Sequence, residues 1–203
     1  EQTDEVEWVK TLFPGTEDYL DTYERFGLLG ENALFGHAIH LTPRERARIL
    51  DIGAAVAHCP TSNTFFVSGL FVAFERASAG HRVGLATDTG GGSNFSMLRT
   101  MAAAYEVSQL RGQALHASQL MYLASEGAAD AVGLAGTVGC LGPGADADIV
   151  VLDLSSTPAI AQRQRHAENF WDTLFATIMM GDDRAVHTVW IAGQEHIGAE
   201  KPQ

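Results

Sequence analysis

Three titratable side chains each stand at the end of a short apolar run in this sequence. His37 lies in the run ALFGHAI, His58 follows residues 54–57, and Asp88 follows residues 82–87. Two imidazoles and one carboxylate suit a divalent metal ion such as zinc, and general acid–base chemistry near neutral pH. One histidine beside an apolar run is more often a hydrogen-bonded structural residue. Three polar residues at equivalent positions favour a shared site.

The residues around Asp88 form a glycine loop, DTGGGSNFSML. Glycines let the backbone bend sharply and let a ligand approach closely, and the helix that follows offers a positive amino-terminal end. No Gly-Lys-Ser/Thr follows the glycines, which disfavours a phosphate loop. His40 lies three residues after His37, but the two histidines straddle the end of a strand. We therefore keep His37 as the functional candidate and give His40 no assigned role.

Nucleophilic catalysis finds less support in this sequence. The Gly-x-Ser-x-Gly motif of serine hydrolases is absent. Cys59 lies between an apolar run and a proline, where a buried thiol is expected rather than a reactive thiolate. With Cys140 it makes two cysteines in all, which excludes a disulfide scaffold and suits a reducing compartment such as the cytoplasm.

Short apolar segments alternate with longer helical patterns through most of the chain. The expected strands are residues 33–39, 54–57 and 82–87, and the expected helices are residues 42–53, 69–79, 97–110 and 118–132, after two helices before residue 27. The clearest helix start is Thr42-Pro43-Arg44-Glu45, a capping box with proline at the first helical position. The alternation predicts parallel βα units, whose strand ends gather polar residues at one edge.

The composition changes near residue 134. A glycine-rich segment is followed by an expected strand at 147–154, a helix at 159–180 and a last strand at 185–191. These elements suggest a small β-sheet appended to the α/β body, with one helix packing back on it.

The charge balance excludes some classes of partner. Thirteen basic and 25 acidic residues give a net charge of −12. Such a surface repels phosphate backbones and anionic lipids, so we expect neither nucleic acid nor membrane as a partner. No apolar run approaches the roughly 18 residues of a membrane-spanning helix, and the first residues do not resemble a signal peptide.

Several stretches together resemble the amidohydrolase superfamily and, within it, the guanine deaminases. They are EQTDEVEWVKTLFP, LFGHAIHLT, AHCPTSN, GLATDTGGGSNFSML and GADADIVVLD. The stretch around Asp88 is the most specific, because related deaminases and chlorohydrolases usually differ after this aspartate. The resemblance implies the carboxyl-terminal portion of a (β/α)8 TIM barrel, with incomplete barrel units over residues 1–134 and part of an appended β-sheet domain over residues 135–203.

The resemblance also implies a reaction: zinc-dependent hydrolytic deamination of guanine to xanthine and ammonia in purine catabolism. Asp88 matches the zinc-binding aspartate at the end of strand 8, which also accepts the proton of the attacking water. His37 matches the histidine of strand 6 that orients this water. Glu1 matches the glutamate that shuttles protons to the purine ring, and His58 is expected to play a structural or supporting role. A homodimer in the cytoplasm is implied as well.

The resemblance leaves part of the family's metal site unmatched. That site also uses a His-x-His pair and a histidine three residues before the glutamate, and this sequence contains neither. We therefore expect the remaining ligands on an amino-terminal part, and we expect the 203-residue chain alone to be inactive. Two alternatives stay open: another aminohydrolase or chlorohydrolase of the superfamily, and a non-catalytic remnant that keeps the scaffold.

Overall fold

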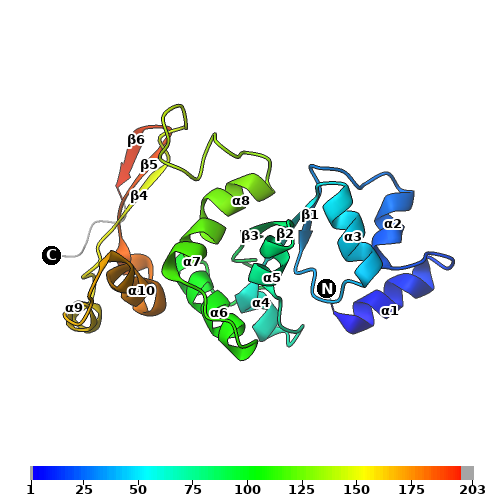
Figure 1. The fold of residues 1–203 in the computed structure, drawn as a ribbon, viewed down its shortest axis with the longest axis horizontal. Coiled ribbons are helices and arrows are strands. Elements are labelled where there is room, and N and C mark those ends of the chain that lie inside the picture. The colour runs from blue at the N-terminus through cyan, green and yellow to red at the C-terminus, as the bar shows by residue number, and fades with distance from the viewer. Residues whose placement is uncertain (1, 198–203) are drawn as a thin grey trace.

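The computed structural model describes residues 2–197, which form two three-stranded sheets and ten α-helices in an elongated row (Figure 1). The helices are α1 (Thr3–Leu12), α2 (Tyr19–Arg25), α3 (Pro43–Asp51), α4 (Pro60–Phe65), α5 (Ala73–Ser78), α6 (Met97–Leu110), α7 (Ala117–Ala124), α8 (Glu126–Ala131), α9 (Pro158–Gln164) and α10 (Phe170–Met180). The strands are β1 (Leu34–Gly36), β2 (Ala55–His58), β3 (Arg82–Leu85), β4 (Ile149–Leu152), β5 (Val186–Ile191) and β6 (Gln194–Ile197), and one 3₁₀ turn covers Asp183–Ala185.

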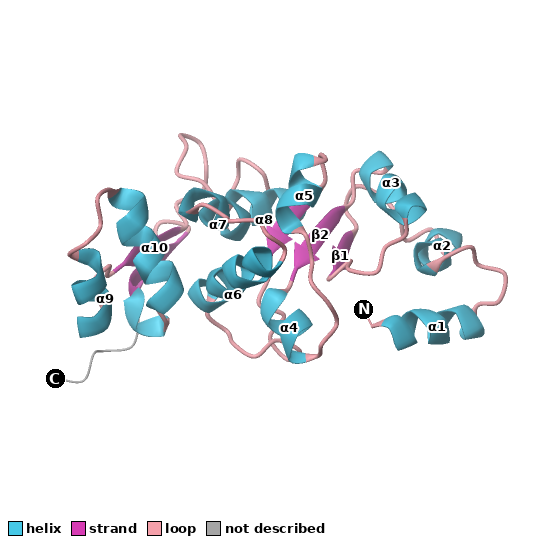
Figure 2. Ribbon diagram, turned by 60° about the horizontal axis from the view of Figure 1, so that its bottom comes forward, coloured by secondary structure: helices cyan, strands magenta, loops and turns pink. Residues whose placement is uncertain are grey.

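The first sheet is parallel, with the strand order β1-β2-β3. Figure 2 shows β1 and β2 in the middle of the molecule, with α5 above them and α4 below. The central strand β2 and its neighbour β3 place Val56, Val83 and Leu85 in the core, each less than 5% exposed. The predicted parallel βα units are therefore confirmed, and their strands end at one edge of the sheet.

The strand β1 is shorter than the strand predicted from the apolar run at residues 33–39. It ends at Gly36 because the next two residues, His37 and Ala38, have φ angles of 64° and 50°. Left-handed backbone cannot continue a strand. The chain leaves the sheet here, which places the His37 side chain at the sheet edge.

The helix α3 begins as the sequence predicted. The Thr42 hydroxyl accepts a hydrogen bond from the Glu45 backbone N–H, and the Glu45 carboxylate accepts one from the Thr42 N–H at 2.6 Å. The other Glu45 oxygen accepts from the backbone N–H of Leu20 at 2.9 Å. This buried carboxylate therefore joins the start of α2 to the start of α3.

Other helices differ from their predicted bounds. The helix α4 was not predicted, and the helix expected over 69–79 covers only Ala73–Ser78. The expected helix 118–132 is divided at Ser125, whose φ and ψ of −128° and −93° are not helical. The expected helix 159–180 contains a second start at Asn169, whose side chain accepts from the Asp172 N–H. The hydrophobic periodicity alone predicted continuous helices, but local capping residues divide them in the structure.

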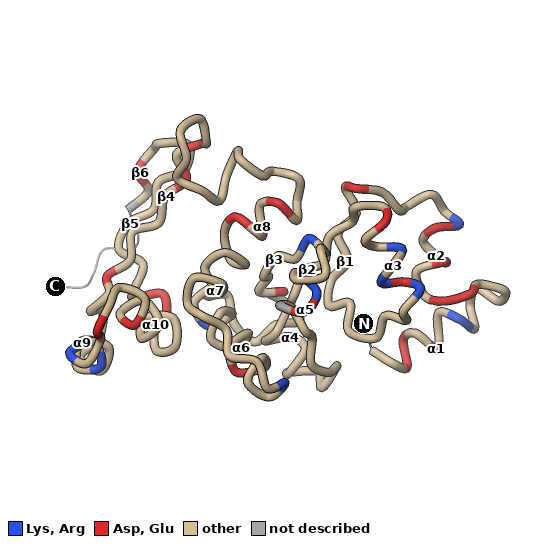
Figure 3. The backbone as a smooth tube through the Cα atoms, viewed as in Figure 1, with Lys and Arg blue, Asp and Glu red and all other residues tan. Residues whose placement is uncertain are grey.

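The second sheet is antiparallel, with the order β4-β5-β6. The helix α10 packs against α6 and α7, and the rings of Tyr105 and Phe175 meet edge to face with centroids 4.9 Å apart. Acidic residues are spread along the whole row of elements (Figure 3). Within the part of the chain that the structure describes, no helix has the length and apolar character needed to cross a membrane.

Candidate metal-binding active site

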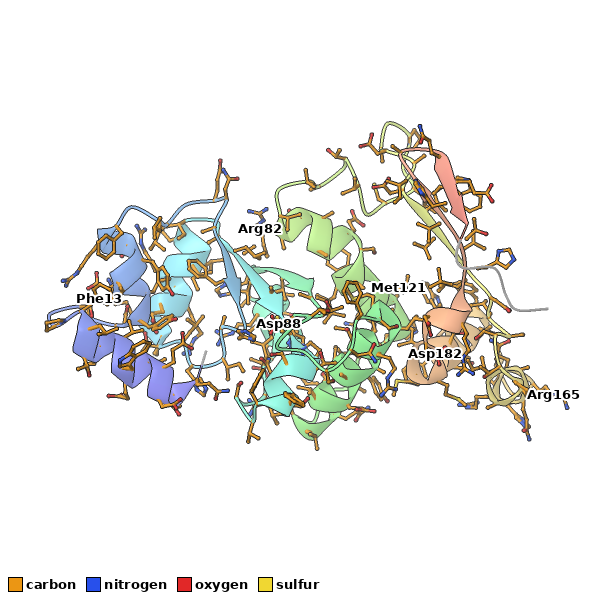
Figure 4. The ribbon with its side chains drawn as sticks, turned by 180° about the vertical axis from the view of Figure 1, so that it is seen from behind. Phe13, Arg82, Asp88, Met121, Arg165 and Asp182 are labelled. Atoms are coloured by element: carbon orange, nitrogen blue, oxygen red, sulfur yellow. The ribbon has the colours of Figure 1, made fainter. Side chains whose placement is uncertain are left out.

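The ends of the outer two strands bring His37 and Asp88 together. His37 follows β1 and Asp88 follows β3, and their side chains meet across the end of β2 with Nε2 and Oδ2 3.6 Å apart. Figure 4 shows Asp88 near the middle of the molecule, beside the strands. Both side chains are part-exposed, at 26% and 35%. A ligand from solvent can therefore reach the pair.

Unusual backbone geometry aims both side chains. Asp88 has a φ of 52°, in the same left-handed region as His37 at 64°. Residues other than glycine adopt this region at a cost of about 1–3 kcal/mol each, and such strain clusters at functional sites. The backbone N–H of His37 still donates to the Ala57 carbonyl at 2.9 Å, which ties the strained residue to β2.

The glycine loop after Asp88 requires its glycines. The Asp88 carbonyl accepts hydrogen bonds from the backbone N–H groups of Gly91 and Gly92. A Cβ on Gly92 would lie 2.0 Å from the Thr87 carbonyl oxygen, and a Cβ on Gly91 would lie 3.0 Å from Asp88 Oδ2. The loop therefore cannot close with a side chain at position 92, and a side chain at position 91 would crowd the Asp88 carboxylate.

Asn63 orients His37. Its side-chain Oδ1 lies 2.8 Å from His37 Nδ1, and the residue is 1% exposed on α4. An amide oxygen can only accept, so Nδ1 carries the hydrogen in this arrangement, and in the neutral ring Nε2 is left as the acceptor on the side of Asp88. Asn63 lies in the stretch AHCPTSN, and the sequence alone indicated no role for it.

His58 lies at the same edge but inside the core. It is 1% exposed, and its ring packs on Phe71 with centroids 5.0 Å apart. Burial, with a smaller contribution from the nearby His37, lowers the pKa of His58 to about 3. A neutral ring fits the expected structural or supporting role. His40 Nε2 lies 2.8 Å from the Ser68 carbonyl oxygen.

Cys59 joins the pair at the strand ends. The expected burial of its thiol is confirmed at 3% exposure, and burial raises its pKa to about 11. The structure adds that one ligand atom each of His37, Cys59 and Asp88 lie within 4.8 Å of one another. The sequence signal for this placement is the position directly after β2, at the edge where the other two strands end.

These three residues can hold a metal ion. They form the one group of three or more histidine, cysteine and acidic side chains with metal-ligand spacing among the described residues. Nitrogen, sulfur and carboxylate oxygen donors are the set that zinc takes in proteins. The predicted catalytic Glu1 lies outside the described residues. Its neighbour Gln2 donates from Nε2 to the Ser68 hydroxyl at 2.8 Å.

Residues 1–195 match the sequence model of the amidohydrolase family. The chain is 39% identical to guanine deaminase of Escherichia coli over 194 residues, which are 96% of this chain and 44% of that protein. It is 41% identical to a probable guanine deaminase of Deinococcus radiodurans, covering 95% of this chain and 45% of that one. The chain thus spans less than half the length of these relatives.

Solved structures agree with these relatives. The structure of E. coli guanine deaminase superposes with a TM-score of 0.93 at 38% identity, covering 96% of this chain and 46% of that one. A guanine deaminase from C. acetobutylicum with bound guanine gives a TM-score of 0.85 at 27% identity, covering 96% and 46%. An adenosine deaminase from Xanthomonas campestris with bound zinc gives 0.81 at 25% identity, covering 97% and 44%.

The expected fold class is therefore confirmed as part of a TIM-barrel-type amidohydrolase fold. The family match over residues 1–195 covers nearly all of the chain and includes His37 and Asp88. The chain belongs to the amidohydrolase family.

Proposed function

We propose that this chain carries part of the active site of a zinc-dependent guanine deaminase, acting as part of a longer chain. The observation that supports the proposal most is the pair His37 and Asp88, which two separate strand ends bring within 3.6 Å of each other. The names of the relatives above supply the substrate, guanine. The expected products are xanthine and ammonia.

Asp88 would hold the zinc ion through its carboxylate, which the glycine loop fixes from behind. Zinc, when bound, lowers the pKa of a coordinated water so that hydroxide is available near neutral pH. The Asp88 carboxylate would accept the proton of the attacking water. His37 would present the Nε2 lone pair to that water, because Nδ1–H is engaged by Asn63.

The balanced reaction joins the water oxygen to C2 of guanine and breaks the bond from C2 to its amino nitrogen. One proton goes to a ring nitrogen and a further proton leaves with the nitrogen as ammonia. We assign this proton shuttle to Glu1 on the strength of the family resemblance. The homodimer and the cytoplasmic location are proposals on the same basis, and two free cysteines support a reducing compartment.

The test uses the protein purified as the complete gene product, assayed for ammonia release with guanine, other aminopurines and chlorotriazines. Guanine should be the best substrate. Asp88→Asn and His37→Gln should each lower kcat/KM by at least about 10²-fold, while the exposed control Asp146→Asn should leave it unchanged. Preference for another amine or a chlorotriazine would overturn the substrate, and unchanged activity in both site variants would overturn the site.

A second assay addresses the 203-residue chain by itself. No two histidines in the sequence are two residues apart, so the chain lacks the His-x-His pair of the family's metal site. We expect no zinc-dependent xanthine production from it alone. Robust turnover by this polypeptide without a partner would contradict that expectation.

A further inference from the structure

We propose that Phe66 is a specificity-determining residue, and that its ring forms one wall of a site for a planar aromatic substrate such as a purine. The inference rests on the proposed function, since it needs a substrate bound beside Asp88. It goes beyond that function because it assigns the recognition of a flat ring system to a residue of this chain.

The Phe66 ring lies against the glycine loop that follows Asp88. A Cβ added to Gly91 would lie 3.3 Å from Phe66 Cε2 and 3.0 Å from Asp88 Oδ2. The ring edge and the carboxylate oxygen therefore approach the same point of the loop. This carboxylate oxygen is also the one that lies 3.6 Å from His37 Nε2. Phe66 is thus placed at the rim of the pair that the proposed reaction uses.

Packing leaves much of this side chain open. Phe66 directly follows α4, whose first four residues are buried, yet Phe66 itself is 50% exposed. The neighbouring ring of Phe65 meets it edge to face, with the ring centroids 5.1 Å apart. An aromatic ring that is half open beside a reactive site gains apolar burial when a flat ligand covers it. The exposed part of Phe66 is therefore available to a substrate.

Backbone contacts hold the ring in place. The Phe66 N–H donates to the Ser62 carbonyl at 3.0 Å, and the Phe66 carbonyl accepts from Gln2 Nε2 at 3.2 Å. The same Gln2 nitrogen donates to the Ser68 hydroxyl at 2.8 Å. Between these contacts Val67 has a φ of 57°, a rare conformation for a β-branched residue. Such backbone persists only where surrounding contacts fix it, and it clusters at sites that hold ligands.

The position of the ring indicates the chemistry of the ligand. Gln2 directly follows Glu1 in the sequence, so its contacts join the segment of the proposed proton shuttle to the turn that carries Phe66. A substrate that reaches Asp88 therefore lies beside an aromatic side chain. Aromatic side chains stack on planar π systems, and every nucleobase offers such a face. Saturated rings and open-chain amides do not, so the site should select flat aromatic amines.

The experiment combines steady-state kinetics on guanine with equilibrium dialysis of xanthine, which is not consumed, using the complete gene product. Phe66→Ala should raise KM and the dissociation constant of xanthine by about 10–100-fold. The kcat should change by less than about 3-fold, because stacking acts alike in the ground state and the transition state. Phe66→Tyr should behave as the unaltered protein. Phe170→Ala, at a position of α10 that is 60% exposed, is the matched control and should change none of these values.

Phe66→Leu separates recognition from packing. Leucine still fills the space against Gly91 but has no aromatic face. The affinity for xanthine should therefore fall as in Phe66→Ala, while the midpoint of urea unfolding stays close to that of the unaltered protein. If Phe66→Leu bound xanthine as tightly as the unaltered protein does, the ring would act by packing only and the proposal would be overturned.

The two proposals fail in different ways. If the unaltered protein acts on another aromatic amine instead of guanine, the deaminase proposal loses its substrate, yet Phe66→Ala should still raise KM for that amine. If guanine is the substrate and Phe66→Ala leaves KM and xanthine binding unchanged, the function stands and the aromatic wall is refuted. Failure of the unaltered protein to bind xanthine or any aromatic amine would overturn both.

Discussion

Asn63 shows how a residue outside the reacting groups can set their chemistry. It is buried on α4 and receives the Nδ1 hydrogen of His37, so that Nε2 is the free acceptor at the site. Its own Nδ2 has no hydrogen-bond partner among the described residues. The amide therefore gains one hydrogen bond and leaves one donor unsatisfied, which makes it a poor choice for stability alone.

We predict that Asn63→Leu lowers activity while changing stability little. The substitution removes one hydrogen bond and one orphan donor together, so the free energy of unfolding should change by less than about 1 kcal/mol. Loss of the orienting partner should lower kcat/KM by about 10–100-fold. Nitrogen NMR of His37 should show a shift from the Nδ1–H toward the Nε2–H tautomer.

Asn63→Asp is the conservative variant for this test, because a carboxylate still accepts from Nδ1. It should retain the Nδ1–H tautomer. If Asn63→Leu kept full activity with an unchanged tautomer, the positioning role of Asn63 would be refuted.

At the scale of elements, Glu45 and the helix starts it joins illustrate the role of buried polar groups. One oxygen caps α3 and the other receives the N–H of Leu20 in α2, at 2.9 Å. The residue is 2% exposed. Removing its carboxylate would leave the buried Leu20 N–H without a partner and would remove the cap from the Thr42 N–H, which lies at an exposed residue.

Glu45→Ala should therefore destabilise the protein by about 2–4 kcal/mol, since the one unsatisfied buried donor costs about 1–3 kcal/mol and the lost cap costs about 1 kcal/mol. Urea unfolding measures this change. Glu45→Gln should recover part of the loss, because the amide oxygen still accepts one of the two bonds. Glu106→Ala, at an exposed position of α6, should change stability by less than about 0.5 kcal/mol.

The loop between α5 and β3 carries a pH-sensitive residue. His81 is 9% exposed, and its Nδ1 has no hydrogen-bond partner among the described residues. Burial lowers the pKa of His81 below its ordinary value of 6.5, and the positive charges of Arg76 and Arg46 lower it further. The folded state therefore binds the proton less readily than the unfolded state.

Stability should accordingly be highest above the unfolded-state pKa of 6.5 and should fall as the pH is lowered below it. One such group contributes a slope of at most about 1.4 kcal/mol per pH unit. Urea unfolding at several pH values should show a shallower slope for His81→Gln than for the exposed control His166→Gln. Equal slopes in the two variants would contradict the assignment.

At the scale of the whole molecule, the chain exposes more surface than its size requires. Its accessible area is 11491 Å², whereas a compact monomer of this mass has about 9,200 Å². A groove of about 1220 Å³ between the start of α6 and the second sheet is mostly apolar, and Phe95 beside it is 80% exposed.

In the described structure, β1 pairs only with β2, so it is an edge strand whose first residue, Leu34, is 45% exposed.

We predict that the 203-residue chain alone self-associates through this edge, because an unpaired apolar strand recruits another chain. Leu34→Lys should lower the weight-average mass measured by sedimentation. Leu110→Lys, at a position that is 73% exposed at the end of α6, is the matched control and should leave the mass unchanged. The same mass in both variants would place the association elsewhere.

Much of the fold was predictable because its signals are local. The capping box at Thr42 and Glu45 and the full length of α6, Met97–Leu110, follow from neighbouring residues whose spacing matches one helix period. The alternation of apolar runs and helices predicted a parallel sheet, and with it the meeting of His37 and Asp88 at one edge. The family followed from stretches that contain these same residues.

Only the tertiary structure showed which other side chains reach the site. The sequence predicted only a buried thiol at Cys59 and indicated no role for Asn63. In the structure the Cys59 sulfur lies within 4.8 Å of ligand atoms of His37 and Asp88, and the Asn63 side chain holds the histidine ring. Their placement depends on the left-handed backbone at His37 and Asp88 and on the turn from β2 into α4. Such geometry is set by contacts between residues far apart in the sequence, so the residue types near one position cannot encode it.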